Sequence, residues 1–152
     1  YIFHASGTGT TQAGLVCGKL QADAEKKESG RCAGGQKIIG ISIARNEARG
    51  REVVRQSIED YLGARYEELY RDEALIFTDE YCMGGYGKYT PEVAQTIEKV
   101  MQSDGIPMDT TYVGKAFHGM IQYVEAHGLQ GKNILFVHTG GTPLYFDFLE
   151  RR

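Results

Sequence analysis

Apolar residues follow two spacings along the chain. Continuous apolar runs rich in β-branched residues are typical of strands covered on both faces, and we assign them to residues 1–5, 37–43, 75–77 and 133–138. Apolar residues three or four positions apart predict helices over residues 11–28, 47–61, 91–104, 117–127 and 144–149. Strands that alternate with helices predict an α/β fold of three layers, α/β/α, around a mostly parallel sheet.

The helical spacing also assigns side chains to the core. It predicts that Met101 and Ile121 face inward from the third and fourth helices. Cys17 lies in an apolar helical stretch and is expected to be a small core residue. His138 ends a strand predicted to be buried, a position typical of a histidine that is hydrogen-bonded within the core.

Four loops of small residues are expected at one edge of this sheet. Ser6–Thr11 and Thr139–Thr142 each follow a strand directly, and Met83–Tyr89 and Thr111–Lys115 can reach the same edge. Ligands of open α/β sheets bind outside the carboxyl ends of the strands. The convergence of these loops predicts a cleft for a small anionic ligand.

The stretch Ser6–Gly14 is the strongest candidate for binding that anion. Its glycines allow a tight turn and close approach to a ligand, its threonines supply hydroxyl donors, and the helix that follows supplies free N–H groups with partial positive charge. Together these features are typical of a phosphate cradle. The plainer interpretation is a turn that begins a helix and binds nothing.

Polar side chains in the other loops are candidates for chemistry. Tyr86 and Tyr112 can act as acid or base if neighbours lower their pKa; the alternative is that both rings pack and their hydroxyls are hydrogen-bonded at the rim. Lys115 could contact a phosphate or form a Schiff base. Its alternative is a solvated charge in the first turn of a helix.

Composition excludes several classes of function. The 152 residues suffice for one domain, with 41% hydrophobic and 24% charged residues. A net charge of -3 does not favour nucleic acid or an anionic membrane as a partner, and no apolar run reaches membrane-spanning length. The three cysteines suit a reducing cytoplasm. No His or Cys pair has metal-ligand spacing, so we propose no metal, and Gly7-Thr8-Gly9 lacks the further glycine of a nicotinamide site.

Several stretches together resemble one known family. His4–Leu15 is similar to the phosphate-binding loop of the D-cysteine desulfhydrase and aminocyclopropane-carboxylate deaminase family, which belongs to the tryptophan-synthase-β-like (fold type II) pyridoxal-phosphate enzymes. Further stretches agree in order and spacing: Gly85–Gly87 with Thr90–Glu92, Tyr112–Met120 and His138–Pro143. The resemblance extends over nearly the whole chain and favours the desulfhydrase branch.

The resemblance implies a cofactor, pyridoxal 5'-phosphate, and a set of site residues. The cofactor phosphate would be held by Gly7, Thr8, Gly9, Thr10 and Thr11. Tyr86 and Tyr112 match the family's catalytic tyrosines, and Thr139 would lie near the pyridine nitrogen and leave it largely unprotonated. The implied reaction is α,β-elimination of a small amino acid such as D-cysteine to pyruvate, ammonia and sulfide. An aminocyclopropane-carboxylate deaminase-like enzyme and a non-catalytic phosphate-binding module remain alternatives.

One part of the family pattern is missing from the sequence. The lysine that forms the Schiff base lies in the family's N-terminal half, and no lysine of this chain has a matching context. The chain begins at Tyr1 without an initiator methionine. We therefore expect residues 1–152 to be a single α/β segment, the C-terminal part of the cofactor-binding domain. We expect it to be inactive alone, and to assemble as a homodimer or with a companion chain that supplies the missing half. An assembly fragment with an exposed strand edge is a further alternative.

Overall fold

The computed structural model of the protein describes residues 1–150. Its sheet is parallel throughout and has the strand order β3-β2-β1-β4. The strands are β1 (Ile2–Ser6), β2 (Ile38–Ser42), β3 (Ile76–Thr78) and β4 (Leu135–Val137). Each lies close to its predicted range. The prediction of a mostly parallel sheet is confirmed.

Helices connect the strands. The longer ones are α1 (Thr10–Glu28), α2 (Glu47–Leu62), α4 (Pro91–Asp104), α5 (Val113–Ala126) and α6 (Thr142–Glu150). Between α2 and β3 the chain forms short turns that the apolar spacing did not predict: η1 (Gly63–Arg65), α3 (Tyr66–Leu69) and η2 (Asp72–Ala74).

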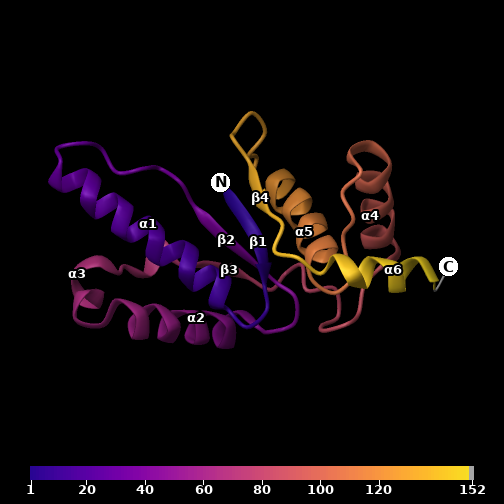
Figure 1. Ribbon diagram of the computed structural model, residues 1–152, viewed down its shortest axis with the longest axis horizontal. Coiled ribbons are helices and arrows are strands. Elements are labelled where there is room, and N and C mark those ends of the chain that lie inside the picture. The colour runs from indigo at the N-terminus through magenta and orange to yellow at the C-terminus, as the bar shows by residue number, and fades with distance from the viewer. Residues whose placement is uncertain (151–152) are drawn as a thin grey trace.

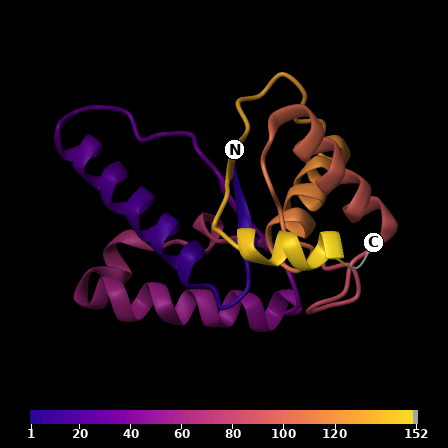
Figure 2. The same cartoon turned by 45° about the vertical axis from the view of Figure 1, so that its right-hand side comes forward.

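The helices form a layer on each face of the sheet. Figure 1 shows α1 and α2 on one side of the strands and α5 with α4 on the other, and Figure 2 shows the same separation from a second angle. Ile38 points toward the α1 layer and packs with Val16 and Ile58. Its neighbour Ile39 points the opposite way, toward α5. Because successive strand residues face opposite sides, a continuous apolar strand serves both layers, and the three-layer prediction is confirmed.

The central strand β1 is paired on both edges. Phe3 is in register with Ile39 of β2 and with Phe136 of β4. Just ahead of the strand, the Tyr1 amino group donates to the Asn133 carbonyl at 2.8 Å, and Leu135 N donates to the Tyr1 carbonyl at the same distance. The start of the chain is thus fastened to a segment more than 130 residues away.

Some burial predictions are wrong. β4 is a three-residue strand at the edge of the sheet, so Leu135 is 56% exposed and His138 beyond it is also exposed. Met101 and Ile121 were expected in the core but are 37% and 44% exposed, because they lie on the outer rows of α4 and α5. Cys17 is buried in the α1 layer, as predicted.

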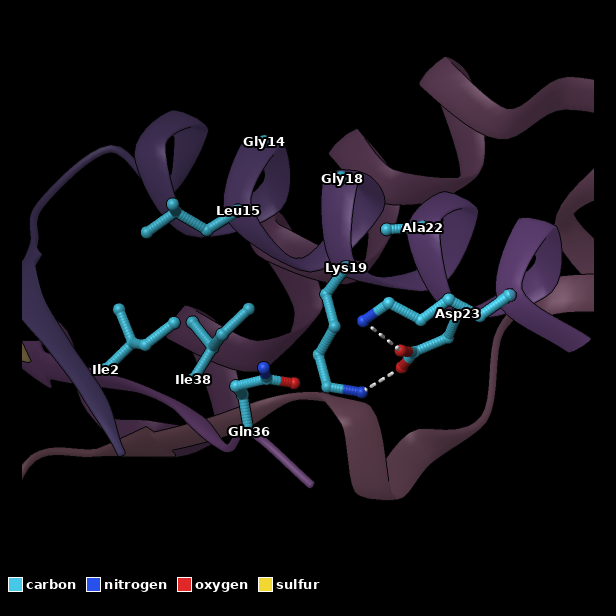
Figure 3. A pocket seen from close by; sticks show the side chains of 10 residues that line it. Ile2, Gly14, Leu15, Gly18, Lys19, Ala22, Asp23, Gln36 and Ile38 are labelled. Atoms are coloured by element: carbon cyan, nitrogen blue, oxygen red, sulfur yellow. Dashed lines mark hydrogen bonds and ion pairs between the residues drawn. The ribbon is translucent and has the colours of Figure 1, made fainter. Parts of the chain in front are cut away.

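A groove of about 370 Å³ lies between α1 and the beginnings of β1 and β2 (Figure 3). Apolar side chains of Ile2, Leu15 and Ile38 line it, and Asp23 at one end pairs with Lys19. Ile2 and Ile38 are the first residues of their strands, so the groove lies away from the loops predicted to bind a ligand. Among residues 1–150, no helix has both the length and the apolar character needed to cross a membrane.

Candidate functional site

The loops that follow β1, β2 and β4 meet at the carboxyl edge of the sheet. The parallel register places Ser6 beside Ser42 and His4 beside Val137, so the loops leave the sheet at similar levels. We call Ser6–Thr11 the threonine loop and Cys82–Tyr89 the tyrosine loop. The threonine loop and the loop after β4 lie close together, as predicted, because β1 and β4 are neighbouring parallel strands.

The threonine loop presents an uncapped helix start. Gly9 is the N-cap of α1 with φ +97°, and no side chain caps the helix there. A Cβ on Gly9 would lie 2.8 Å from Val54 Cγ2, so both the backbone angle and the space require glycine. Thr8, Thr10 and Thr11 are exposed. The first-turn amides and these hydroxyls are therefore accessible to an anion.

Contacts from neighbouring elements hold the threonine loop in place. Ser6 Oγ donates to Gln12 Oε1 at 2.9 Å, and Gln12 Nε2 donates to the Ile76 carbonyl at 2.7 Å, which ties the start of α1 to β3. The Arg45 guanidinium, from the loop after β2, donates to the Gly7 carbonyl. The loop is thus held by contacts with β3 and with the loop that follows β2.

The tyrosine loop brings two hydroxyls together. Met83, Gly84 and Gly85 have φ values of +51°, +85° and +106°, which form a tight turn ahead of Tyr86. Tyr86 is 63% exposed, and its hydroxyl lies 2.5 Å from that of Tyr112. The rings meet edge to face with centroids 5.8 Å apart. The two tyrosines predicted as the catalytic pair therefore form one hydrogen-bonded unit.

Tyr112 also lies beside the threonine loop and at the start of α5. A Cβ on Gly7 would lie 4.0 Å from Tyr112 Cε1, which places the ring next to the predicted phosphate cradle. The hydrogen bond with Tyr86 raises the pKa of Tyr112, and burial and the Asp109 carboxylate add to this increase. A tyrosine acts as a base most readily if its neighbours lower its pKa, and the neighbours of Tyr112 do the opposite. Its hydroxyl is protonated at neutral pH and can donate.

Asp109 fixes the position of Tyr112. Its carboxylate accepts backbone hydrogen bonds from Thr111 at 2.8 Å, Tyr112 at 2.7 Å and Val113 at 2.8 Å, and the side chain is fully buried. The carboxylate accepts from the first amide of α5 and from the two amides just before it, and a negative charge at this end stabilises a helix start. This explains why α5 begins at Val113, four residues earlier than its apolar spacing predicted.

Lys115 is not a solvated charge. Its side chain is fully buried, and Nζ donates to the Gly85 carbonyl at 2.6 Å and to the Ile43 carbonyl at 3.1 Å. Burial lowers the pKa of Lys115, whereas nearby Cys82 and Asp109 act to raise it. The nitrogen thus faces carbonyl groups of two loops inside the protein, and the solvated alternative for this residue is wrong.

The loop after β4 completes the edge. His138 is not a core residue: Gly140 N donates to its Nδ1 at 3.3 Å, so Nε2 carries the proton and donates to the Pro107 carbonyl at 3.0 Å. Thr139 is exposed. A Cβ on Gly141 would lie 2.7 Å from Asp109 Oδ1, so this loop packs close to the residue that positions Tyr112. The role of Thr139 at a pyridine nitrogen stays a prediction.

Two residues of the site were not singled out from sequence. Asp109 carried a usable signal, since an aspartate followed by two threonines is typical of a helix start. Arg45 carried none, because arginines in polar loops are common and the carbonyl that it contacts lies 38 residues away.

Sequence comparison finds relatives over nearly the whole chain. No protein-family model matches it. A Pyrococcus abyssi protein, provisionally named 1-aminocyclopropane-1-carboxylate deaminase, is 32% identical over 149 residues, which is 98% of this chain and 41% of that protein. A D-cysteine desulfhydrase of Klebsiella pneumoniae is 31% identical over 150 residues, which is 95% of this chain and 40% of that protein.

Structural comparison agrees. A crystal structure described as an ACC deaminase homologue matches 99% of this chain with a TM-score of 0.76 and 31% identity. The resemblance to the deaminase and desulfhydrase family is confirmed. The chain spans about two fifths of the proteins that it matches, 42% in the case of the crystal structure. The activity of a complete deaminase or desulfhydrase is therefore a proposal for this chain.

Proposed function

We propose that this chain forms the cofactor-phosphate and tyrosine part of a pyridoxal-phosphate-dependent lyase that resembles D-cysteine desulfhydrase. Its reaction is α,β-elimination from a small amino acid. The observation that carries the proposal is the Tyr86–Tyr112 hydroxyl pair, which lies beside the uncapped start of α1. The pair supplies a proton-transfer group, and the helix start supplies an anion site.

The threonine loop fits the phosphate of the cofactor. A dianionic phosphate needs several donors and a favourable field, and the first-turn amides of α1 with the hydroxyls of Thr8, Thr10 and Thr11 offer both. Gly9, at φ +97° and against Val54, lets the chain turn closely into α1 and leaves the hydroxyl-bearing side chains exposed. Thr139 is exposed at the same edge and supplies a neutral hydroxyl for the ring nitrogen.

The tyrosine pair manages a proton. When bound, pyridoxal phosphate supplies the electron sink that makes the α-proton of an amino acid acidic. The Tyr112 hydroxyl, with its raised pKa, holds a proton at Oη. α,β-Elimination transfers the α-proton to a base of the assembled protein and breaks the bond between the β-carbon and sulfur, which leaves as hydrosulfide and takes up a proton. Tyr86, which is exposed and hydrogen-bonded to Tyr112, can donate that proton to the hydrosulfide.

A binding experiment tests the phosphate site without relying on a lysine. Pyridoxine 5'-phosphate carries the phosphate but no aldehyde, and pyridoxine carries neither. Calorimetry should show binding of the phosphorylated compound and at least ten-fold weaker binding of pyridoxine. Equal affinity for the two compounds would remove the phosphate-site assignment.

Turnover requires a lysine amine that can form the Schiff base. The Lys115 amine is bonded to two carbonyls and is buried, so it is not presented to an aldehyde at the sheet edge. We therefore propose that the chain alone does not turn over substrate and that a companion chain that supplies the lysine completes the site. Sulfide release from D-cysteine with added pyridoxal phosphate measures this. Release at an enzymatic rate by the chain alone would contradict the proposal.

The alternative substrate is aminocyclopropane carboxylate. Relatives at similar identity are named for both activities, 32% for the deaminase and 31% for the desulfhydrase. Assembled protein given either substrate separates the two. Desulfhydrase activity releases sulfide with ammonia from D-cysteine, whereas deaminase activity releases ammonia from aminocyclopropane carboxylate.

A further inference from the structure

Lys115 has an unusual environment for a lysine. Its side chain is fully buried in the first turn of α5, and both acceptors of Nζ are backbone carbonyls. Removing an ammonium group from water is costly unless strong hydrogen bonds replace the lost hydration. A buried cation that contacts two separate loops points to a specific task for those contacts.

The two carbonyls belong to the segments that frame the tyrosine pair. Ile43 directly follows β2, and Gly85 directly precedes Tyr86. The Gly85 carbonyl and the Tyr86 amide belong to the same peptide unit, which is planar. A hydrogen bond that fixes this carbonyl therefore fixes the direction in which the chain enters Tyr86.

In the tyrosine loop, Met83 packs against the core and Tyr89 contacts Phe148, but among residues 1–150 the backbone next to Tyr86 has few other hydrogen bonds. Its own backbone bonds, Gly85 N to the Cys82 carbonyl at 3.0 Å and Lys88 N to the Gly85 carbonyl at 3.2 Å, are turn contacts. Met83, at φ +51°, is in the left-handed region that disfavours a non-glycine residue. The Tyr86 side chain is mostly exposed, so burial does not fix it either.

We propose that Lys115 is a positioning residue that sets the Tyr86 hydroxyl against that of Tyr112. Lys115 lies three residues after Tyr112, so one turn of α5 carries one tyrosine and holds the loop of the other. The catalytic meaning of this inference rests on the proposed function. Its geometric content does not, because the hydroxyl pair is observed in the chain itself.

The test compares Lys115→Met with Lys132→Met. Methionine keeps the apolar stem of lysine and removes the donors, and Lys132 is exposed in the turn before β4 and serves as the matched control. Hydrogen–deuterium exchange should become at least ten-fold faster over residues 83–89 in Lys115→Met. Exchange over residues 6–11 should stay within two-fold of the original chain, and Lys132→Met should change neither segment.

A second measurement reports on the hydroxyl pair directly. The ionisation of Tyr112, followed by NMR of tyrosines labelled at the ring carbon bearing the hydroxyl, should move from its raised pKa toward the ordinary value of 10.0 in Lys115→Met. Lys115→Arg keeps a cation at this position but not the compact ammonium group, so the Tyr112 pKa should lie between its values in the original chain and in Lys115→Met. A merely structural role would lower stability and leave this ionisation unchanged in the folded protein.

Lys115→Gln serves as a second variant if Lys115→Met does not fold. Unchanged exchange over residues 83–89 in either folded variant would overturn the role of Lys115. An ordinary Tyr112 pKa in the unaltered chain would also overturn it, because the two hydroxyls would then not be held together. Pyridoxine 5'-phosphate affinity should stay within two-fold in Lys115→Met. If the unaltered chain does not bind pyridoxine 5'-phosphate, that result counts against the proposed function. The exchange and NMR results decide the role of Lys115.

Discussion

The threonine loop and the tyrosine loop lie at the same edge of the sheet but are built differently. The threonine loop joins β1 directly to α1, and its shape follows from one left-handed glycine and the helix that starts beside it. The tyrosine loop begins four residues after the end of β3 and does not lead directly into a helix, and the buried Lys115, 30 residues away in sequence, donates to its Gly85 carbonyl. The threonine loop thus has several supports, its own helix and the contacts of Gln12 and Arg45, whereas the position of Tyr86 depends more on the single contact from Lys115.

The largest expected effect is on α5, the helix whose Lys115 bonds the tyrosine loop. Asp109→Ala removes an acceptor of three backbone N–H groups, of which that of Val113 is buried and the other two are partly buried, so we expect a loss of about 3 kcal/mol of unfolding free energy. Urea unfolding measures this loss. Asp147→Ala, at an exposed position, is the control and should stay within ~0.5 kcal/mol. A small effect of Asp109→Ala would mean that α5 does not depend on this cap.

The next effect should be confined to the threonine loop. Gly9→Ala places a Cβ at φ +97° and 2.8 Å from Val54 Cγ2, so we expect a loss of about 2 kcal/mol and at least ten-fold weaker binding of pyridoxine 5'-phosphate. Gly14→Ala in the same helix is the matched control. Nothing lies within 4 Å of its Cβ position, and it should stabilise the chain by ~0.5 kcal/mol. Equal effects of the two changes would argue against a strained turn at Gly9.

A smaller effect is the pH dependence of stability that arises from His4 in β1. His4 is fully buried with Nε2 unpartnered among residues 1–150, and burial lowers its pKa, opposed by its contact with the Ala5 carbonyl. Below its ordinary pKa of 6.5 the unfolded chain binds a proton that the folded chain does not. Stability should therefore fall on acidification through this range, by at most about 1.4 kcal/mol per pH unit.

Urea unfolding at several pH values tests this dependence. His4→Gln should show a shallower decline below pH 6.5 than the original chain. His127→Gln, at an exposed position, should decline as the original chain does. Identical slopes for His4→Gln and the original chain would show that His4 does not contribute.

The smallest change in stability is expected for Tyr86→Phe. Because Tyr86 is 63% exposed, its hydroxyl should contribute less than ~1 kcal/mol. The change should nevertheless bring the pKa of Tyr112 down toward its ordinary value, since the hydrogen bond with Tyr86 is the largest cause of the increase. Tyr61→Phe, at another exposed tyrosine, should leave the Tyr112 titration unaltered. An unchanged Tyr112 pKa in Tyr86→Phe would show that the hydroxyls do not interact in solution.

The contrast between the two loops also explains what could be predicted from sequence. The strands, most helices and the threonine loop follow from local patterns, because strand, glycine turn and helix start are adjacent in the chain. The buried state of Lys115 could not be predicted in this way. A lysine near a helix start is ordinarily solvated, and its acceptors at Ile43 and Gly85 come from distant segments.

The same limit applies to burial at the edge of the sheet. The apolar run before His138 is typical of a central strand, yet within residues 1–150 β4 lies at the edge of the sheet and pairs with β1 on one side. The order of strands depends on tertiary pairing and not on the composition of any one strand. The resemblance implied that Tyr86 and Tyr112 are both catalytic, but their direct contact was not predicted, since neither residue indicates the other by its spacing.

The pairing of β1 has a consequence for the timing of synthesis. This strand is among the first residues described, and it receives β2 after about forty residues, but its other neighbour is β4, at residues 135–137. β4 must therefore be synthesised before β1 is paired as it is in this sheet. Until then the β1 edge that pairs with β4 lacks this partner. We expect nascent chains that stop short of β4 to require chaperones more than chains that include it.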